Sequence, residues 1–81
     1  MEYQWRPASS DDLAFARELT RENMLCYYIK HDLLWQDEAF DVAWAGRDNR
    51  LITFGDDVPG YVSLSRDARA LYIRELHVVE A

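Results

Sequence analysis

The sequence has little cysteine, glycine or proline: one, three and two residues, respectively, among 81. A single cysteine cannot form a disulfide within the chain, which is typical of proteins in a reducing compartment. We expect Cys26, which lies in an apolar helical stretch, to be a small core residue rather than a nucleophile. Three glycines make no phosphate-binding loop, and no Ser-His-Asp pattern is recognisable.

Basic residues are also few. Nine Lys and Arg stand against 15 Asp and Glu, which gives a net charge of −6. This balance disfavours binding to nucleic acid and to anionic membranes, because both require cations that neutralise phosphate. It suits a cationic partner such as an amine, although scattered acidic residues also simply cover a solvated surface.

Long hydrophobic runs and targeting signals are missing. The longest apolar runs are too short to cross a bilayer, and the first residues do not resemble a signal peptide. We therefore expect a cytoplasmic protein without a membrane partner. We also expect no metal site, because His31 and His77 lie far apart and Asp56-Asp57 occupies a hairpin turn.

The residues that are present predict one small α+β domain. Apolar residues make up 49% of the chain and aromatic residues 14%, enough for a core. The pattern predicts strands at 3–7, 51–54, 58–65 and 71–79, and helices at 13–29 and 37–45. Short turns between the last three strands require an antiparallel meander. The predicted fold is a four-stranded antiparallel sheet with two helices between the first and second strands.

The helix boundaries are marked by specific residues. Ser9 and Asp12 have the spacing of a capping box at the start of the first helix. Gly46 is expected to end the second helix in the left-handed conformation. The core-facing stripe of the first helix is expected to contain Phe15, Leu19, Cys26 and Ile29.

The final strand, Leu71-Tyr-Ile-Arg-Glu-Leu-His-Val78, resembles the central strand of the GNAT N-acetyltransferase superfamily. The opening segment, Arg6-Pro-Ala-Ser-Ser-Asp-Asp12, is similar to the start of the same family's domain. The resemblance covers nearly the whole chain and implies that residues 1–81 form a single partial domain, the N-terminal half of the GNAT fold. In the family, a loop that binds the pyrophosphate of acetyl-CoA follows this strand. We therefore expect the 81-residue chain alone to bind acetyl-CoA weakly and to be inactive.

The resemblance also implies functional positions in the last strand. Main-chain atoms of Leu76, His77 and Val78 would bind the acetyl-CoA co-substrate, and Glu75 matches a frequent position of the catalytic base. Glu75 has an alternative interpretation as a solvated residue that pairs with Arg74 or Arg66. The valines beside His77 favour a packed sheet position over a base.

The expected acceptor is a small-molecule or peptide amine, for which Tyr27, Tyr28 and Trp35 are candidate contacts. Aromatic rings offer a cationic amine a π face, although the same side chains could simply pack in the core. A second function is also open: a non-enzymatic half-domain that self-associates or binds a partner chain through its exposed last strand. For the 81-residue chain alone we expect a homodimer formed through that last strand or the face beside it.

Overall fold

The computed structural model describes residues 2–79 and has the predicted α+β architecture. The elements, in chain order, are β1 (Tyr3–Pro7), the 3-10 turn η1 (Ser10–Asp12), α1 (Leu13–Lys30), α2 (Asp37–Ala45), β2 (Asp48–Phe54), β3 (Asp57–Arg66) and β4 (Leu71–Val78). The strands form one antiparallel sheet in the order β1-β2-β3-β4. Both helices lie between β1 and β2 in the chain, which confirms the predicted fold.

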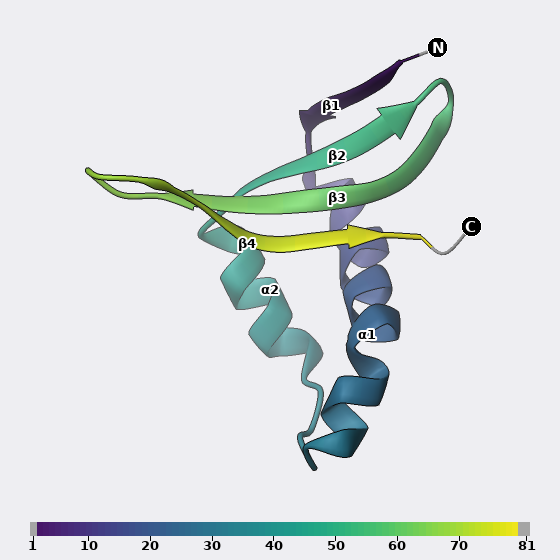
Figure 1. Ribbon diagram of the computed structural model, residues 1–81, viewed down its shortest axis with the longest axis vertical. Coiled ribbons are helices and arrows are strands. Elements are labelled where there is room, and N and C mark those ends of the chain that lie inside the picture. The colour runs from purple at the N-terminus through teal and green to yellow at the C-terminus, as the bar shows by residue number, and fades with distance from the viewer. Residues whose placement is uncertain (1, 80–81) are drawn as a thin grey trace.

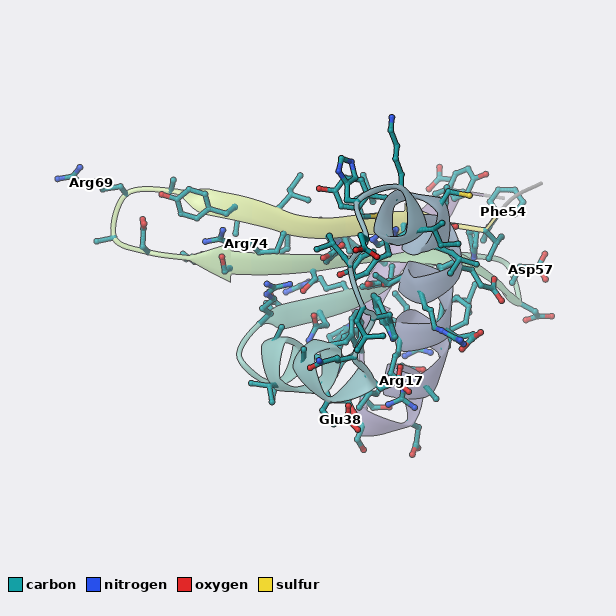
Figure 2. The ribbon with its side chains drawn as sticks, turned by 90° about the horizontal axis from the view of Figure 1, so that it is seen from below. Arg17, Glu38, Phe54, Asp57, Arg69 and Arg74 are labelled. Carbon is teal, nitrogen blue, oxygen red and sulfur yellow. The ribbon has the colours of Figure 1, made fainter. Side chains whose placement is uncertain are left out.

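Both helices cover the same face of the sheet (Figure 1). The core between the layers contains Ala16 and Leu19 of α1, Leu51 of β2 and Tyr61 of β3. Seen from the helix side, the β3–β4 hairpin extends past the helices to the turn that contains Arg69 (Figure 2). The helices therefore cover only part of the sheet, and the pocket described below lies on this covered face.

The opposite face of the sheet is apolar and open. Because side chains alternate along a strand, the neighbours of core residues on β2 and β3 point to this second face. The residues that contribute apolar side chains to it include Trp5, Ile52, Val62, Leu64, Ile73, Leu76 and Val78. Val62 and Leu64 are buried within the sheet, whereas Ile73, Leu76 and Val78 on β4 are 66%, 58% and 54% exposed.

The start of the first helix is fixed by the predicted capping pair. The Asp12 carboxylate accepts hydrogen bonds from the Ser9 backbone N–H at 2.9 Å and from the Ser9 hydroxyl at 3.3 Å. It also forms an ion pair with Arg6 of β1 at 3.2 Å. These contacts satisfy a free donor at the helix start and tie the helix to the first strand.

The predicted stripe of α1 is correct only in the first half of the helix. Ala16, Leu19 and Thr20 are buried, but Cys26 is exposed and Ile29 is 71% exposed. The expectation that Cys26 is a core residue is therefore wrong. The last turns of α1 extend beyond the sheet, so their apolar side chains have no layer to pack against (Figure 1).

Glycine conformations differ from the prediction at one helix end. Gly46 follows α2 but has φ −94°, so the expected left-handed conformation is wrong. The left-handed residues are instead Gly55, at φ 61° in the β2–β3 turn, and Asp32, at φ 54° just after α1. Asp32 allows the chain to reverse after α1, and the Leu33 N–H there donates to the Tyr28 carbonyl at 2.8 Å.

The pairing of β3 with β4 shifts by one residue at Arg74. Ser63 pairs with Glu75 and Leu64 pairs with Ile73, so Arg74 is the extra residue of a bulge. Adjacent side chains at such a bulge can point to the same face, which brings Glu75 to the helix side. No helix within residues 2–79 is long and apolar enough to cross a membrane.

Candidate functional site

A pocket of about 270 Å³ lies between the helices and the covered face of the sheet. Its walls come from α1, from the segment 34–36 between the helices, from α2 and from the facing strands β3 and β4. The aromatic lining residues are Tyr28, Trp35, Phe40, Trp44 and Tyr61. Polar lining residues include Thr20, Arg47, Ser63 and Glu75. An apolar cleft with a few polar groups is the usual form of a small-molecule site.

The aromatic rings form a continuous series through the pocket wall. Tyr28 packs edge-on against Trp35 with ring centroids 5.5 Å apart. Phe40 then lies 6.0 Å from both Trp35 and Trp44, and Trp44 lies 5.8 Å from Tyr61. Each separation is within the range of favourable ring–ring contacts. The series connects the end of α1 to the centre of the sheet.

Glu75 is held in the pocket wall by a chain of polar contacts. His77 Nε2 lies 2.6 Å from Glu75 Oε2, and the His77 side chain is only 10% exposed. The Asn23 amide of α1 donates to His77 Nδ1 at 3.3 Å and to the Val78 carbonyl at 3.2 Å. Since Nδ1 is then an acceptor, neutral His77 carries its proton on Nε2 and donates it to Glu75. This arrangement orients the carboxylate.

Tyr61 and Thr20 form a buried hydroxyl pair beside the pocket. The Thr20 hydroxyl donates to the Ala16 carbonyl at 2.8 Å, so the Tyr61 hydroxyl donates to Thr20. Burial raises the pKa of Tyr61 to about 12, and the negative charge of Glu75 adds to the increase. The Tyr61 ring also stacks on His77 with centroids 5.7 Å apart. Tyr61 is therefore a neutral donor at physiological pH.

Arg47 places a cation on the other side of this pocket. It lines the pocket just before β2, and its charge acts on the Tyr61 hydroxyl in the opposite sense to Glu75. Within residues 2–79, no carboxylate forms an ion pair with its guanidinium. Asn49 and Ser63, which lie between Arg47 and Glu75 across the sheet, satisfy each other through a hydrogen bond of 2.7 Å.

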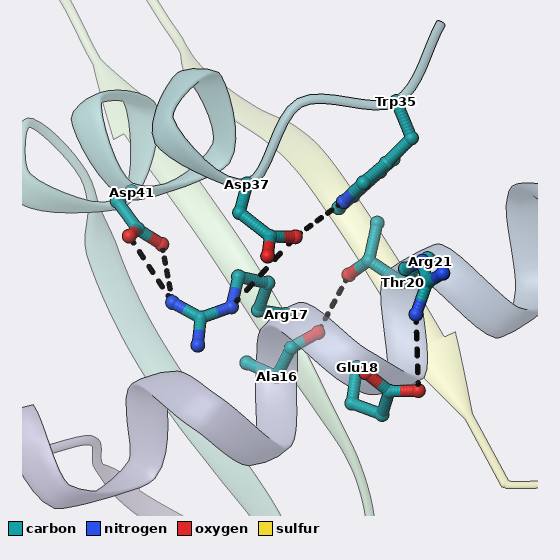
Figure 3. Close-up of polar contacts among 8 residues, drawn as sticks. All are labelled: Ala16, Arg17, Glu18, Thr20, Arg21, Trp35, Asp37 and Asp41. Atoms are coloured by element: carbon teal, nitrogen blue, oxygen red, sulfur yellow. Dashed lines mark hydrogen bonds and ion pairs between the residues drawn. The ribbon is translucent and has the colours of Figure 1, made fainter.

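An ion-pair cluster fixes Trp35, one of the residues that line the pocket (Figure 3). The Trp35 indole N–H donates to Asp37 at 2.6 Å. Arg17 of α1 donates to both oxygens of Asp41 at 3.0 and 3.1 Å, and its Nε lies 4.0 Å from Asp37. Because one arginine contacts both acids of α2, the cluster ties the two helices together next to the pocket.

The outer edge of β4 presents main-chain groups. The Val79 N–H donates to the Pro59 carbonyl at 2.7 Å, which makes that pair a hydrogen-bonded one. By alternation, His77 and Glu75 direct their main-chain groups toward β3, whereas Leu76 and Val78 direct theirs toward the open edge. Of the three predicted main-chain positions, two therefore face outward.

The structure brings together three of the four side chains predicted from the sequence. Tyr28, Trp35 and Glu75 all line the pocket described above. Tyr27 lies outside it, is 50% exposed and packs against His31. Glu75 bonds to His77 rather than to its predicted partners: the guanidinium of Arg74 donates to Ser65 at 2.7 Å.

Several residues of the site were not predicted from the sequence; they include the polar residues Asn23 and Arg47 and the lining residues Thr20, Phe40, Tyr61 and Ser63. Asn23 stands within a helix, where asparagine is disfavoured without a tertiary partner, and this was its only signal. Arg47 follows the helix-ending Gly46 and looks like an ordinary turn residue.

Comparisons of the chain with protein-family models, with curated proteins and with solved structures find no match. Between residues 2 and 79 there is no group of three or more His, Cys, Asp or Glu side chains that could hold a metal ion. The pocket residues and the sequence resemblance are therefore the two indications of function.

Proposed function

We propose that this chain forms the N-terminal part of an acetyl-CoA-dependent N-acetyltransferase and that its pocket holds the amine acceptor. The observation that carries the proposal is the Glu75 carboxylate, fixed by His77 at 2.6 Å in the wall of an aromatic pocket. The order of strands and helices agrees with the fold that the sequence resemblance implies.

The chemistry requires a base next to the acceptor. A protonated amine is not a nucleophile, so Glu75 would take one proton from it. The neutral nitrogen then attacks the thioester carbonyl, the new C–N bond forms and the C–S bond breaks. As the amide forms, its nitrogen loses a second proton, and the leaving thiolate takes up one proton to become the free thiol. Aromatic walls hold the amine in place beside the carboxylate.

Acetyl-CoA would lie along the open edge of β4. Its pantetheine arm contains amides, and the outward main-chain groups of Leu76 and Val78 can pair with such amides as a further strand would. Residues 2–79 contain no glycine-rich loop for the pyrophosphate. The proposal therefore assigns only the arm of the co-substrate to these residues.

The test is release of free coenzyme A thiol by the natural gene product that contains this chain, measured against a panel of amines. We expect acetyl-CoA turnover that depends on the amine. Tyr28→Ala and Trp35→Ala should each raise KM for the amine and leave KM for acetyl-CoA nearly unchanged. Glu75→Gln should lower kcat by about 10²-fold or more, the usual contribution of a positioned base.

Leu33→Ala is the matched control. Leu33 belongs to the same segment between the helices but is 51% exposed and does not line the pocket. It should leave both KM values unchanged. Variants of Tyr28 and Trp35 that melt several degrees lower with normal kinetics would instead assign these residues to packing.

A second candidate function is a non-enzymatic half-domain that self-associates. The observation that favours it is the open edge of β4 beside the exposed side chains of Ile73, Leu76 and Val78. An unprotected strand edge is a template for pairing with another chain. Absence of turnover together with a stable β4-dependent dimer would select this function.

A further inference from the structure

The pocket contains two opposite charges that do not neutralise each other. Glu75 on β4 and Arg47 before β2 both line it, and they do not form an ion pair with each other. Glu75 is satisfied by His77. The guanidinium of Arg47 has five donors and, within the part of the chain that the structure describes, no acidic partner.

Arg47 directly precedes β2, and Glu75 lies on β4, two strands away in the sheet. Asn49, Ser63 and Glu75 are paired in register across β2, β3 and β4. With strands about 4.8 Å apart, the backbones of Asn49 and Glu75 lie roughly 10 Å from each other, and Arg47 comes two residues before Asn49. Both side chains face the helix side, so a small molecule between them can contact both.

Beside polar lining residues such as Thr20, Gln36 and Ser63, the pocket has an aromatic surface. Tyr28, Trp35 and Phe40 form the side toward the helices, as their successive ring contacts show. The volume of about 270 Å³ lies just below the range of drug-sized sites and suits one small metabolite. The site therefore offers an anion partner, a cation partner and an aromatic surface.

We propose that the acceptor is a free amino acid with an apolar side chain, whose amine faces Glu75 and whose carboxylate is bound by Arg47. The proposal rests on the proposed function and names its substrate class. Arginine is suited to this role because its planar fork matches a carboxylate with two hydrogen bonds. The side chain of the amino acid lies against Tyr28, Trp35 and Phe40.

The test measures binding rather than catalysis. Trp35 and Trp44 line the pocket, so ligand entry changes tryptophan fluorescence, and a Trp5→Phe background removes the signal from the opposite face of the sheet. The three probes are phenylalanine, phenethylamine, which lacks the carboxylate, and 3-phenylpropanoate, which lacks the amine. We expect phenylalanine to bind at least about tenfold more tightly than either analogue, the effect of one charge-assisted hydrogen bond.

Two variants assign the charges. Arg47→Gln should weaken phenylalanine binding about tenfold and leave phenethylamine binding unchanged. Glu75→Gln should weaken phenylalanine binding and leave 3-phenylpropanoate binding unchanged. Arg66→Gln is the control, because Arg66 is an exposed arginine at the far end of β3 that does not line the pocket.

The inference is overturned if phenethylamine binds the unaltered chain as tightly as phenylalanine, or if phenylalanine gives no saturable signal. The ligand series needs no variant, so a failure of Arg47→Gln to fold leaves the test valid. Turnover of acetyl-CoA with amines that lack a carboxylate, without preference for amino acids, would overturn this inference alone. Lack of turnover with any amine is the separate failure of the proposed function.

Discussion

Gly60 shows how closely β3 and β4 approach each other. A Cβ at this position would lie 2.2 Å from the His77 carbonyl oxygen and 3.0 Å from Val78 Cα. These are backbone atoms, so the strands themselves would have to move. We predict that Gly60→Ala lowers the free energy of unfolding by about 1–3 kcal/mol, the usual cost of overpacking.

Gly46→Ala is the matched control for this variant. A Cβ at Gly46 would meet only the Ala43 carbonyl, at 3.9 Å, and its φ of −94° suits any residue. Urea denaturation of both variants decides the matter: equal loss of stability in the two would mean that the approach at Gly60 carries no cost.

Because of Tyr61, the free energy of unfolding should depend on pH in the alkaline range. Burial raises its pKa from 10.0 to about 12, so the folded chain retains a proton that the unfolded chain loses. The contribution of Tyr61 is complete below pH 10 and is lost as the pH rises through about 12. The shift corresponds to a loss of roughly 2–3 kcal/mol in the free energy of unfolding.

Tyr61→Phe tests this assignment. The variant removes the titrating hydroxyl, and Thr20 keeps its hydrogen bond to the Ala16 carbonyl. Its free energy of unfolding should therefore depend less on pH above 10 than that of the unaltered chain. Parallel curves for the two proteins would assign the alkaline loss to other groups.

At the scale of residues, the sequence predicts which side chains suit the site better than it predicts which residues they contact. Tyr28, Trp35 and Glu75 could be chosen because their residue types suit an amine and because family resemblance indicates their positions. Arg47 and Asn23 could not, because their roles depend on residues distant in sequence. The partner of Glu75 is likewise decided by the bulge at Arg74, which turns its side chain toward His77.

At the scale of elements, an ion pair between Arg17 and Asp41 joins α1 to α2. A single nitrogen of Arg17, Nη1, contacts both carboxylate oxygens of Asp41, and the two side chains are 29% and 38% exposed. We predict a favourable coupling between Arg17→Ala and Asp41→Ala in a double-mutant cycle. The measurement is thermal or urea unfolding of the two single variants and the double variant.

The Glu18–Arg21 pair is the comparison within the same helix. Its charged atoms lie 3.7 Å apart, but its side chains are 58% and 51% exposed. Its coupling should be smaller than that of Arg17–Asp41. The reverse order would show that α2 is held by its aromatic contacts rather than by the ion pair.

Element boundaries follow the sequence where local signals are strong. The limits of α2 are as predicted, and the start of α1 follows the capping residues Ser9 and Asp12. The predicted burial of the outer half of α1 was wrong. A 3.6-residue period shows which side of a helix is apolar, but it does not show where the neighbouring sheet ends. Cys26 and Ile29 are exposed because they lie on the part of α1 that extends beyond the sheet.

At the scale of the molecule, the open edge of β4 predicts that the 81-residue chain alone, with no acetyl-CoA on this edge, forms a dimer. Leu76 and Val78 direct main-chain groups outward, and their apolar side chains are more than half exposed. Pairing of two copies would bury both features at once. We expect light scattering to give twice the chain mass of 9.6 kDa.

Leu76→Lys should convert that dimer to a monomer, because a charge would stand on the paired surface. Val42→Lys is the control: Val42 is 76% exposed on α2, away from the β4 edge, and its replacement should not change the mass. A monomer of the unaltered chain at high micromolar concentration, with cooperative unfolding, contradicts the prediction.

The position of β1 has a consequence for the order of folding. The meander of β2, β3 and β4 forms from neighbours in sequence, whereas β1 pairs with β2 across both helices. Closing that long loop costs entropy before its contacts are gained, so β1 should join the sheet after the meander has formed. All five residues of β1 are exposed, which gives the strand little to hold it. In native-state hydrogen exchange, the amides of β1 should open at lower free energy than those of β3.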